Sequence, residues 1–102
     1  MSREELLAQR QQTFQLATDF SRTLARAYEA INTGKPPAEM DAFAHEALFV
    51  GERYGATLDK LLSLLEEEPG NNKEEIERVI KFKELLRKEQ DLLKFRPPHT
   101  PS

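Results

Sequence analysis

Residues 37–65 have the sequence PAEMDAFAHEALFVGERYGATLDKLLSLL, and this stretch decides the fold. Alternating steps of four and three residues from Met40 give positions that are all apolar or small, namely Met40, Ala44, Ala47, Gly51, Tyr54, Leu58, Leu61 and Leu65. This spacing is typical of a seam along which a helix packs on other helices, as in a coiled coil. No run alternates apolar and polar residues with the period of two that a strand requires. The pattern therefore predicts a helix over 37–67.

The positions beside this seam are also apolar, which widens the buried arc of the helix. They are Phe43, Val50 and Leu64 on one side and Leu48, Gly55 and Leu62 on the other. One neighbour cannot cover such an arc, so we expect a helix on each flank. Glycine costs a helix interior about 1 kcal/mol relative to alanine. Gly51 and Gly55 therefore indicate a notch that admits an aromatic side chain or a close helix approach, with a hinge or ligand notch as the alternative.

Helices are predicted on both sides of this segment, over 3–32 and 73–95. Ser2 and Glu5 form a capping-box start for the first helix, which runs to about Asn32, where Gly34 and the two prolines after it stop it. Its predicted seam consists of Leu7, Arg10, Phe14, Ala17, Ser21, Leu24, Tyr28 and Ile31. Asn72 and Glu75 predict a second capping box. The apolar residues that follow are Ile76, Val79, Ile80, Phe82, Leu85, Leu86, Leu92, Leu93 and Phe95.

Two short linkers join the helices, so neighbours are expected to run antiparallel. We predict an all-α fold, an antiparallel three-helix bundle formed by one domain over 1–95, which dimerisation can complete. Residues 96–102 are predicted to be a flexible proline-rich tail. Large side chains then face small ones across both joints. The predicted pairs are Phe14 and Phe20 with the zone of Ala47, Gly51 and Gly55, Ile80 with Leu61, and Leu93 with Ala47.

Composition excludes several classes of protein. The 102 residues contain no cysteine, which excludes disulfides, thiolate nucleophiles and cysteine-based metal sites. No apolar run approaches 18 residues and no basic leader precedes an apolar stretch, so we expect a cytoplasmic protein. The net charge of −3 argues against a generally basic nucleic-acid binder. A nucleic-acid-contacting regulator stays the alternative, through the basic residues of the third helix: Lys73, Arg78, Lys81, Lys83, Arg87, Lys88, Lys94 and Arg96.

The sequence contains little that resembles catalytic chemistry. His45 follows Asp41 by one helical turn, and Glu52 lies two turns further on. A metal site at these three residues is possible in principle, but a solvated histidine is the favoured interpretation because the ligands do not converge on one helix. No nucleophile–histidine–acid arrangement, phosphate-binding glycine loop or H-E-x-x-H motif is present. We therefore predict a protein that is not an enzyme and has no cofactor or metal.

The most informative surface residue is Phe49, which falls on the outermost line of the central helix. Ala42 and Ala56 share this line, Leu48 lies beside it, and Leu16 is expected to point outward from the first helix. Either a flanking helix covers Phe49 or it is the centre of a contact patch for a protein partner or a second copy. In size and helical pattern the chain resembles bacterial flagellar and type III secretion chaperones and other small helical adaptors. The hypothesis is a protein-interaction module that uses these five residues.

Overall fold

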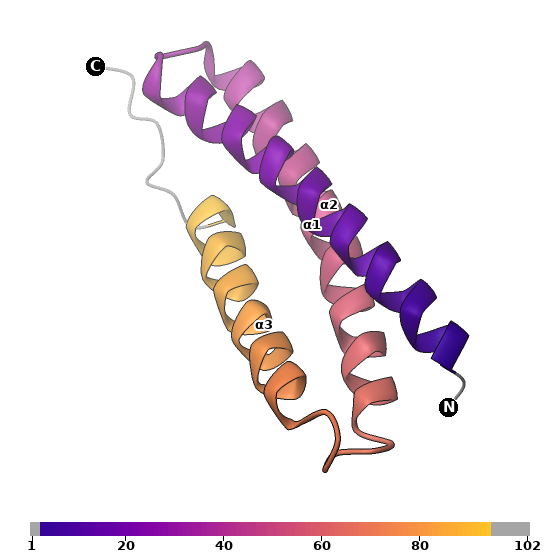
Figure 1. Cartoon of the computed structure of the whole chain (residues 1–102). Helices are drawn as coiled ribbons and strands as arrows, with labels where there is room; N and C mark the ends of the chain where they lie inside the picture. The colour runs from indigo at the N-terminus through magenta and orange to yellow at the C-terminus, as the bar shows by residue number, and fades with distance from the viewer. Residues whose placement is uncertain (1–2, 95–102) are drawn as a thin grey trace.

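Three helices follow one another in the computed structural model, which describes residues 3–94: α1 (Arg3–Asn32), α2 (Pro37–Leu65) and α3 (Lys73–Lys94). Within that range no residue lies in a strand. α1 packs on α2 and α2 packs on α3, with each helix antiparallel to the one before it (Figure 1). The predicted all-α, antiparallel three-helix bundle is confirmed. The predicted cap at Ser2, the apolar Phe95 and the tail over 96–102 lie outside the described residues.

The reversal between α1 and α2 is built by a glycine and two prolines. Gly34 adopts a left-handed φ of 69°. The Lys35 N–H donates to the carbonyl of Ala30 at 3.0 Å, and the Gly34 N–H donates to that of Ile31 at 3.3 Å. These two bonds form a Schellman motif, which satisfies carbonyls at the end of a helix. Pro37 then starts α2, where a missing N–H costs nothing.

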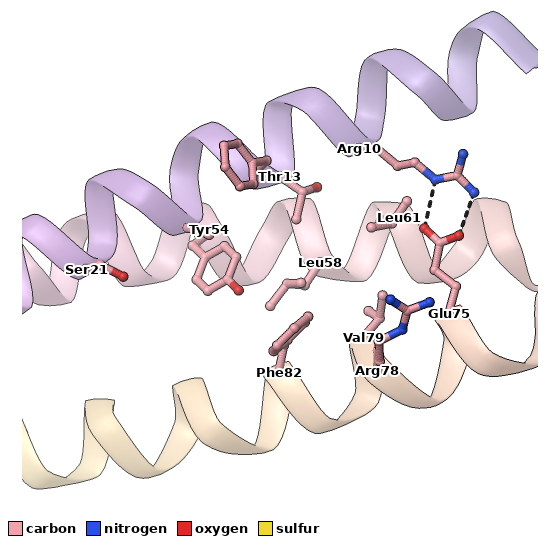
Figure 2. A pocket seen from close by; sticks show the side chains of 12 residues that line it. Arg10, Thr13, Ser21, Tyr54, Leu58, Leu61, Glu75, Arg78, Val79 and Phe82 are labelled. Carbon is pink, nitrogen blue, oxygen red and sulfur yellow. Dashed lines mark hydrogen bonds and ion pairs between the residues drawn. The ribbon is translucent and has the colours of Figure 1, made fainter.

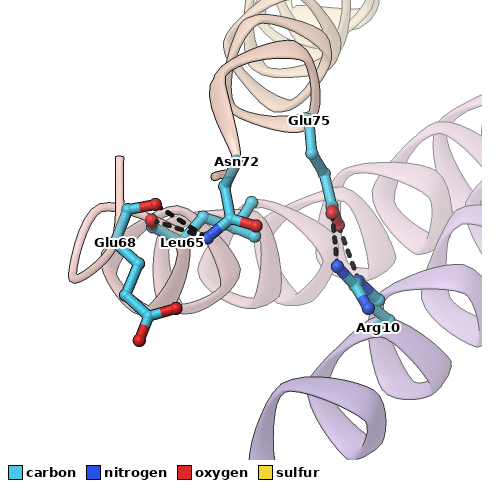
Figure 3. Close-up of polar contacts among 5 residues, drawn as sticks. All are labelled: Arg10, Leu65, Glu68, Asn72 and Glu75. Carbon is cyan, nitrogen blue, oxygen red and sulfur yellow. Dashed lines mark hydrogen bonds and ion pairs between the residues drawn. The ribbon is translucent and has the colours of Figure 1, made fainter. Parts of the chain in front are cut away.

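α2 ends at Leu65, two residues earlier than predicted. Three consecutive glutamates follow Leu65, and their carboxylates oppose the negative end of the helix dipole. The Asn72 side-chain amide donates to the carbonyls of Leu65 at 3.2 Å and Glu68 at 3.1 Å, which caps this end of α2 (Figure 3). Asn72 therefore does not form the predicted capping box with Glu75, whose carboxylate is held by Arg10 instead.

All positions of the predicted α2 seam are buried. The glycine notch in this seam is filled from both sides by the chain's own side chains. A Cβ placed on Gly51 would lie 3.0 Å from Cε1 of Phe20 and 3.5 Å from Cδ1 of Leu86. Phe20 also packs against Tyr54, with the ring centroids 5.9 Å apart. The notch thus admits an aromatic residue of α1 and a leucine of α3, as the first interpretation predicted.

The contact row of α1 lies one residue before the predicted seam. Its buried residues are Leu6, Gln9, Thr13, Leu16, Phe20, Thr23, Ala27 and Ala30. Three of these are polar, and hydrogen bonds to backbone carbonyls satisfy them. Gln9 donates to the carbonyl of Thr57 at 3.2 Å, Thr13 to that of Gln9 at 2.8 Å, and Thr23 to that of Phe20 at 2.9 Å. The threonine methyl groups are then free to pack on α2.

Two predictions for α1 are corrected by this register. Leu16, which was expected to point outward as a contact residue, is only 8% exposed and packs in the core cluster with Phe20 and Tyr54. Phe14, which was expected to meet the glycine notch, is 75% exposed. Both errors have one physical cause. Apolar content favours burial of the row through Phe14. The row that is buried instead contains polar residues, and their hydrogen bonds are made within the chain.

α3 is held by fewer buried side chains than the other helices. Val79, Leu86 and Leu93 are its buried residues, spaced by seven. Leu93 belongs to a core cluster with Ala47, as predicted. Ile80 is 43% exposed, so its predicted pairing with Leu61 is wrong. Consecutive side chains on a helix differ in direction by about 100°. Ile80, which follows the buried Val79, therefore lies beside the face that contacts α2 rather than on it.

The register of α1 predicts a large loss of stability for one substitution and almost none for another two residues away. Leu16→Ala removes buried methyl groups and is expected to lower the free energy of unfolding by about 2–4 kcal/mol. Phe14→Ala removes an exposed side chain and is expected to change the free energy of unfolding by less than about 0.5 kcal/mol. Urea denaturation measures both values. Equal losses, or a larger loss for Phe14→Ala, would contradict the register.

The glycine notch predicts a second contrast. In Gly51→Ala the new methyl group lies against Phe20, and overpacking of about 1–3 kcal/mol outweighs the helix-propensity gain of about 1 kcal/mol. In Gly55→Ala the methyl group meets only Cδ2 of Leu86, at 3.3 Å. Gly55→Ala is therefore expected to be the more stable protein by about 1–2 kcal/mol in chemical denaturation. The reverse order would show that Phe20 does not fill the notch.

Candidate interaction surfaces

The bundle is open between α1 and α3. Among the described residues, no Cα atom of α1 lies within 8 Å of a Cα atom of α3, although both helices pack on α2. α3 stands apart from α1 along its whole length (Figure 1). In a closed three-helix bundle each helix would bury part of its surface against both of the others. Here α1 and α3 meet only through side chains that reach across the space between them.

A groove of about 700 Å³ occupies this opening. We call it the α1–α3 groove, and Figure 2 looks into it. Its lining residues are Arg10, Thr13, Phe14, Ala17 and Ser21 from α1, Tyr54, Leu58 and Leu61 from α2, and Glu75, Arg78, Val79 and Phe82 from α3. α2 supplies a buried apolar floor, and the other two helices supply the walls.

Aromatic side chains are exposed on both walls. Phe14 of α1 is 75% exposed and Phe82 of α3 is 46% exposed. Further large apolar residues extend each wall and are also exposed: Leu7 lies two turns before Phe14, and Leu85 and Leu92 follow Phe82 on the same side of α3. The groove is thus bordered by two rows of exposed apolar side chains.

The α1 wall coincides with the seam that sequence pattern predicted for this helix. Arg10, Phe14, Ala17 and Ser21 all belong to that predicted seam and all line the groove. The pattern was therefore right about an apolar row and wrong about its neighbour. α1 carries two adjacent rows of helical spacing, one used by α2 and one facing the groove. A helix with two such rows is patterned for two neighbours.

A two-point ion pair crosses the groove at one end. Arg10 donates through Nε to Oε2 of Glu75 at 2.8 Å and through a terminal nitrogen to Oε1 at 2.5 Å. The hydrogen bond to Glu75 is the main cause that raises the pKa of Arg10 above its ordinary value. Both side chains are partly exposed. The pair therefore contributes about 1 kcal/mol or less, and its main effect is to fix the spacing of α1 and α3.

A second bridge crosses nearer the other end. The Tyr28 hydroxyl donates to Oε2 of Glu89 at 2.6 Å. Burial, together with the hydrogen bond and the negative charge of Glu89, raises the pKa of Tyr28 to about 12. The two bridges join residues 18 apart on α1 and 14 apart on α3. They therefore bound a stretch of about 21–27 Å at 1.5 Å per residue.

The predicted patch around Phe49 lies on the side of α2 opposite the groove. Phe49 is 62% exposed, so no helix of the described chain covers it. Ala42 and Ala56 are also exposed, while Leu48 is half-buried and packs against the core cluster of Ala44 and Leu93. With Leu16 buried in the core, the patch contains a single large exposed side chain. Isolated apolar residues of this kind are common on protein surfaces.

The remaining predicted chemistry is not brought together in space. Nδ1 of His45 lies 3.1 Å from the backbone carbonyl of Asp41, within one helical turn. Across residues 3–94 no three histidine, cysteine, aspartate or glutamate side chains are close enough to hold a metal ion. Lys83 of α3 pairs with Asp59 of α2 at 2.6 Å, so it is part of the bundle's internal contacts. The other basic residues of α3 divide between two sides of the helix, with Arg78, Lys81 and Lys88 on one and Lys73, Arg87 and Lys94 on the other.

Comparisons with protein-family models, with curated proteins and with solved structures found no match. None of the three described helices is long and apolar enough to cross a membrane. The groove was missed by sequence reasoning, although one signal pointed to it. α3 carries more large apolar residues than its single contact row on α2 can bury.

The Tyr28 bridge predicts an unusual titration. Tyr54→Phe leaves Tyr28 as the only tyrosine, and its absorbance is expected to titrate with a midpoint near pH 12. The folded state favours the neutral Tyr28 phenol, because its pKa is higher there than in the unfolded chain. The resulting stabilisation is complete below pH 10, the ordinary tyrosine pKa, and is lost as the pH rises through about 12. Adding Glu89→Gln keeps the burial and removes the carboxylate, which moves the midpoint down. A midpoint near 10 in both proteins would contradict the bridge.

Proposed function

We propose that this chain is a protein-interaction module that binds an α-helix of another protein in the α1–α3 groove. The observation that carries the proposal is the exposure of Phe14 and Phe82 on opposite walls above a buried apolar floor. Extended apolar surfaces on soluble domains mark sites of interaction. Buried aromatic anchors contribute a large share of the energy in protein interfaces.

The shape and pattern of the groove support a helix as its occupant. Each wall is itself a helix, and its apolar residues recur at intervals of three, four and seven. A fourth helix laid between α1 and α3 meets these rows with matching spacing, because its own side chains follow the same period. The product is a four-helix bundle with α2 opposite the bound helix. Insertion of an amphipathic helix into an apolar groove is a recurrent mode of recognition.

The arrangement of the three helices favours a different polypeptide over a second copy. α1 and α3 are both packed on α2. A helix donated by a second copy must first leave its own bundle and expose its core residues. The homodimer predicted from the sequence is therefore the alternative, and the Phe49 patch stays a predicted second contact. We assign the module to the cytoplasm because a cysteine-free chain suits a reducing compartment.

Groove substitutions are expected to remove binding without unfolding the protein. Phe14→Asp and Phe82→Asp change exposed side chains, so helicity and stability are retained. Each is expected to weaken partner binding at least about tenfold, since it puts a charge where an apolar contact is needed. Phe49→Asp is the matched control, since it makes the same change on the opposite side of α2 and is expected to leave binding intact.

Photo-crosslinking in an extract of the native host provides the measurement. A photoreactive residue at Ala17, inside the groove, is expected to attach to one amphipathic segment of one protein. This product is expected to disappear in Phe14→Asp and to persist in Phe49→Asp. Loss of the product in Phe49→Asp alone would move the site to the predicted patch. Sedimentation of wild type as a dimer that Phe14→Asp dissociates would identify a second copy as the occupant and overturn the proposal.

A further inference from the structure

We infer that the helix bound in the α1–α3 groove is acidic, with carboxylates flanking an apolar stripe of about four to five turns. This inference rests on the function proposed above and adds the chemistry of the partner. It depends on which charges at the groove are already neutralised within the chain and which are not.

Both carboxylates nearest the groove have a partner within the chain, but only the charge of Glu75 is neutralised, because the Tyr28 hydroxyl that bonds Glu89 is itself neutral. Glu75 binds Arg10 through both oxygens, and Glu89 accepts the hydrogen bond of Tyr28. Arg78 differs from these groups. It lines the groove next to Val79 and extends into it (Figure 2). Arg78 makes no ion pair with any residue of the described range 3–94. The groove therefore presents a positive charge that no residue of 3–94 neutralises through an ion pair.

The outer edge of the α3 wall extends this positive charge. Arg78, Lys81 and Lys88 recur with Leu85 and Leu92 at alternating steps of three and four residues, which places all five along one side of α3. Within the described range neither lysine makes an ion pair. The facing edge of α1 carries the uncharged Gln11 and Thr18.

The acidic residues of α3 do not cancel this row on the groove side. Helical spacing puts Glu77 and Glu84 further from the groove than the lysines. Besides Glu75, which is paired with Arg10, the near side carries Glu74 beside the Arg10 bridge and Glu89 at the Tyr28 bridge. Outside the Arg10–Glu75 pair, the groove side of α3 thus carries three cations, Arg78, Lys81 and Lys88, against the two carboxylates of Glu74 and Glu89, in a chain whose net charge is −3. An acidic helix is electrostatically complementary to this edge, and a basic helix is repelled by it.

The bridges set the length of the occupant. The Arg10–Glu75 and Tyr28–Glu89 contacts close the groove at two levels. The span of about 21–27 Å between them accommodates a helix of about 14–18 residues. A longer helix must break one of the bridges or leave the groove at its end.

Two designed peptides of 18 residues test the inference. Both carry leucine at heptad core positions and alanine or glutamine elsewhere, and they differ only in glutamate or lysine at the flanking positions. Fluorescence anisotropy with the full chain measures the two dissociation constants at low and at high salt. We expect the glutamate peptide to bind at least about tenfold more tightly, and the ratio to shrink as salt shortens the screening length.

A matched pair of charge reversals locates the effect. Arg78→Glu with Lys81→Glu is expected to reverse the preference toward the lysine peptide. Arg53→Glu with Lys60→Glu makes the same change of net charge on the exposed face of α2 opposite the groove, and it is expected to keep the preference for glutamate. Circular dichroism checks that both variants stay helical.

The outcomes separate the inference from the proposed function. Equal binding of both peptides, abolished by Phe14→Asp, would overturn the acidic partner and retain the groove as a helix site. An equal response to the two charge reversals would also overturn the inference, because net charge alone would then explain it. Absence of binding by either peptide at millimolar concentration would overturn both.

Discussion

The close approach of Phe20 and Leu86 to Gly51 is the contact on which the rest of the structure depends. α2 has no side chain at this point, so α1 and α3 can each place a large residue against its backbone. The two helices are thereby drawn onto separate flanks of α2. Because α1 and α3 both pack on α2 in this way, they contact each other through polar bridges rather than through a packed apolar layer. The groove results directly from the positions of Gly51 and Gly55 in α2.

The sequence was sufficient for α2 and insufficient for α1, for a reason that lies in the side chains. Every position of the α2 seam is apolar or small, and the apolar residues on both of its flanks centre the buried arc on that row. α1 has two adjacent eligible rows, and the row that is buried contains Gln9, Thr13 and Thr23. Their hydrogen bonds to backbone carbonyls are properties of the folded chain, and apolar content does not reveal them. The helix boundaries were easier, because Gly34 and the prolines after it act locally.

The candidate site was less accessible to sequence reasoning than the fold. The pattern identified Phe49 as exposed, and it is exposed, but one aromatic residue does not define a surface. The groove arises from residues of three helices, and its walls become visible only when α3 is placed away from α1. Arg10 illustrates the difficulty. It looked like an imperfection in an apolar seam, whereas its guanidinium forms the bridge that spaces the two walls.

The sparse anchoring of α3 has a thermodynamic consequence. Three buried side chains at intervals of seven residues hold this helix to α2, and the bridges to α1 are partly exposed. Of the three helices, α3 is therefore expected to have the lowest free energy of local opening and the fastest amide exchange. A helix seated against it supplies the apolar cover that α1 does not, and by linkage it stabilises the closed form in proportion to its occupancy. Occupation of the groove would thus raise the conformational stability of α3, the helix that is least firmly held in the free protein.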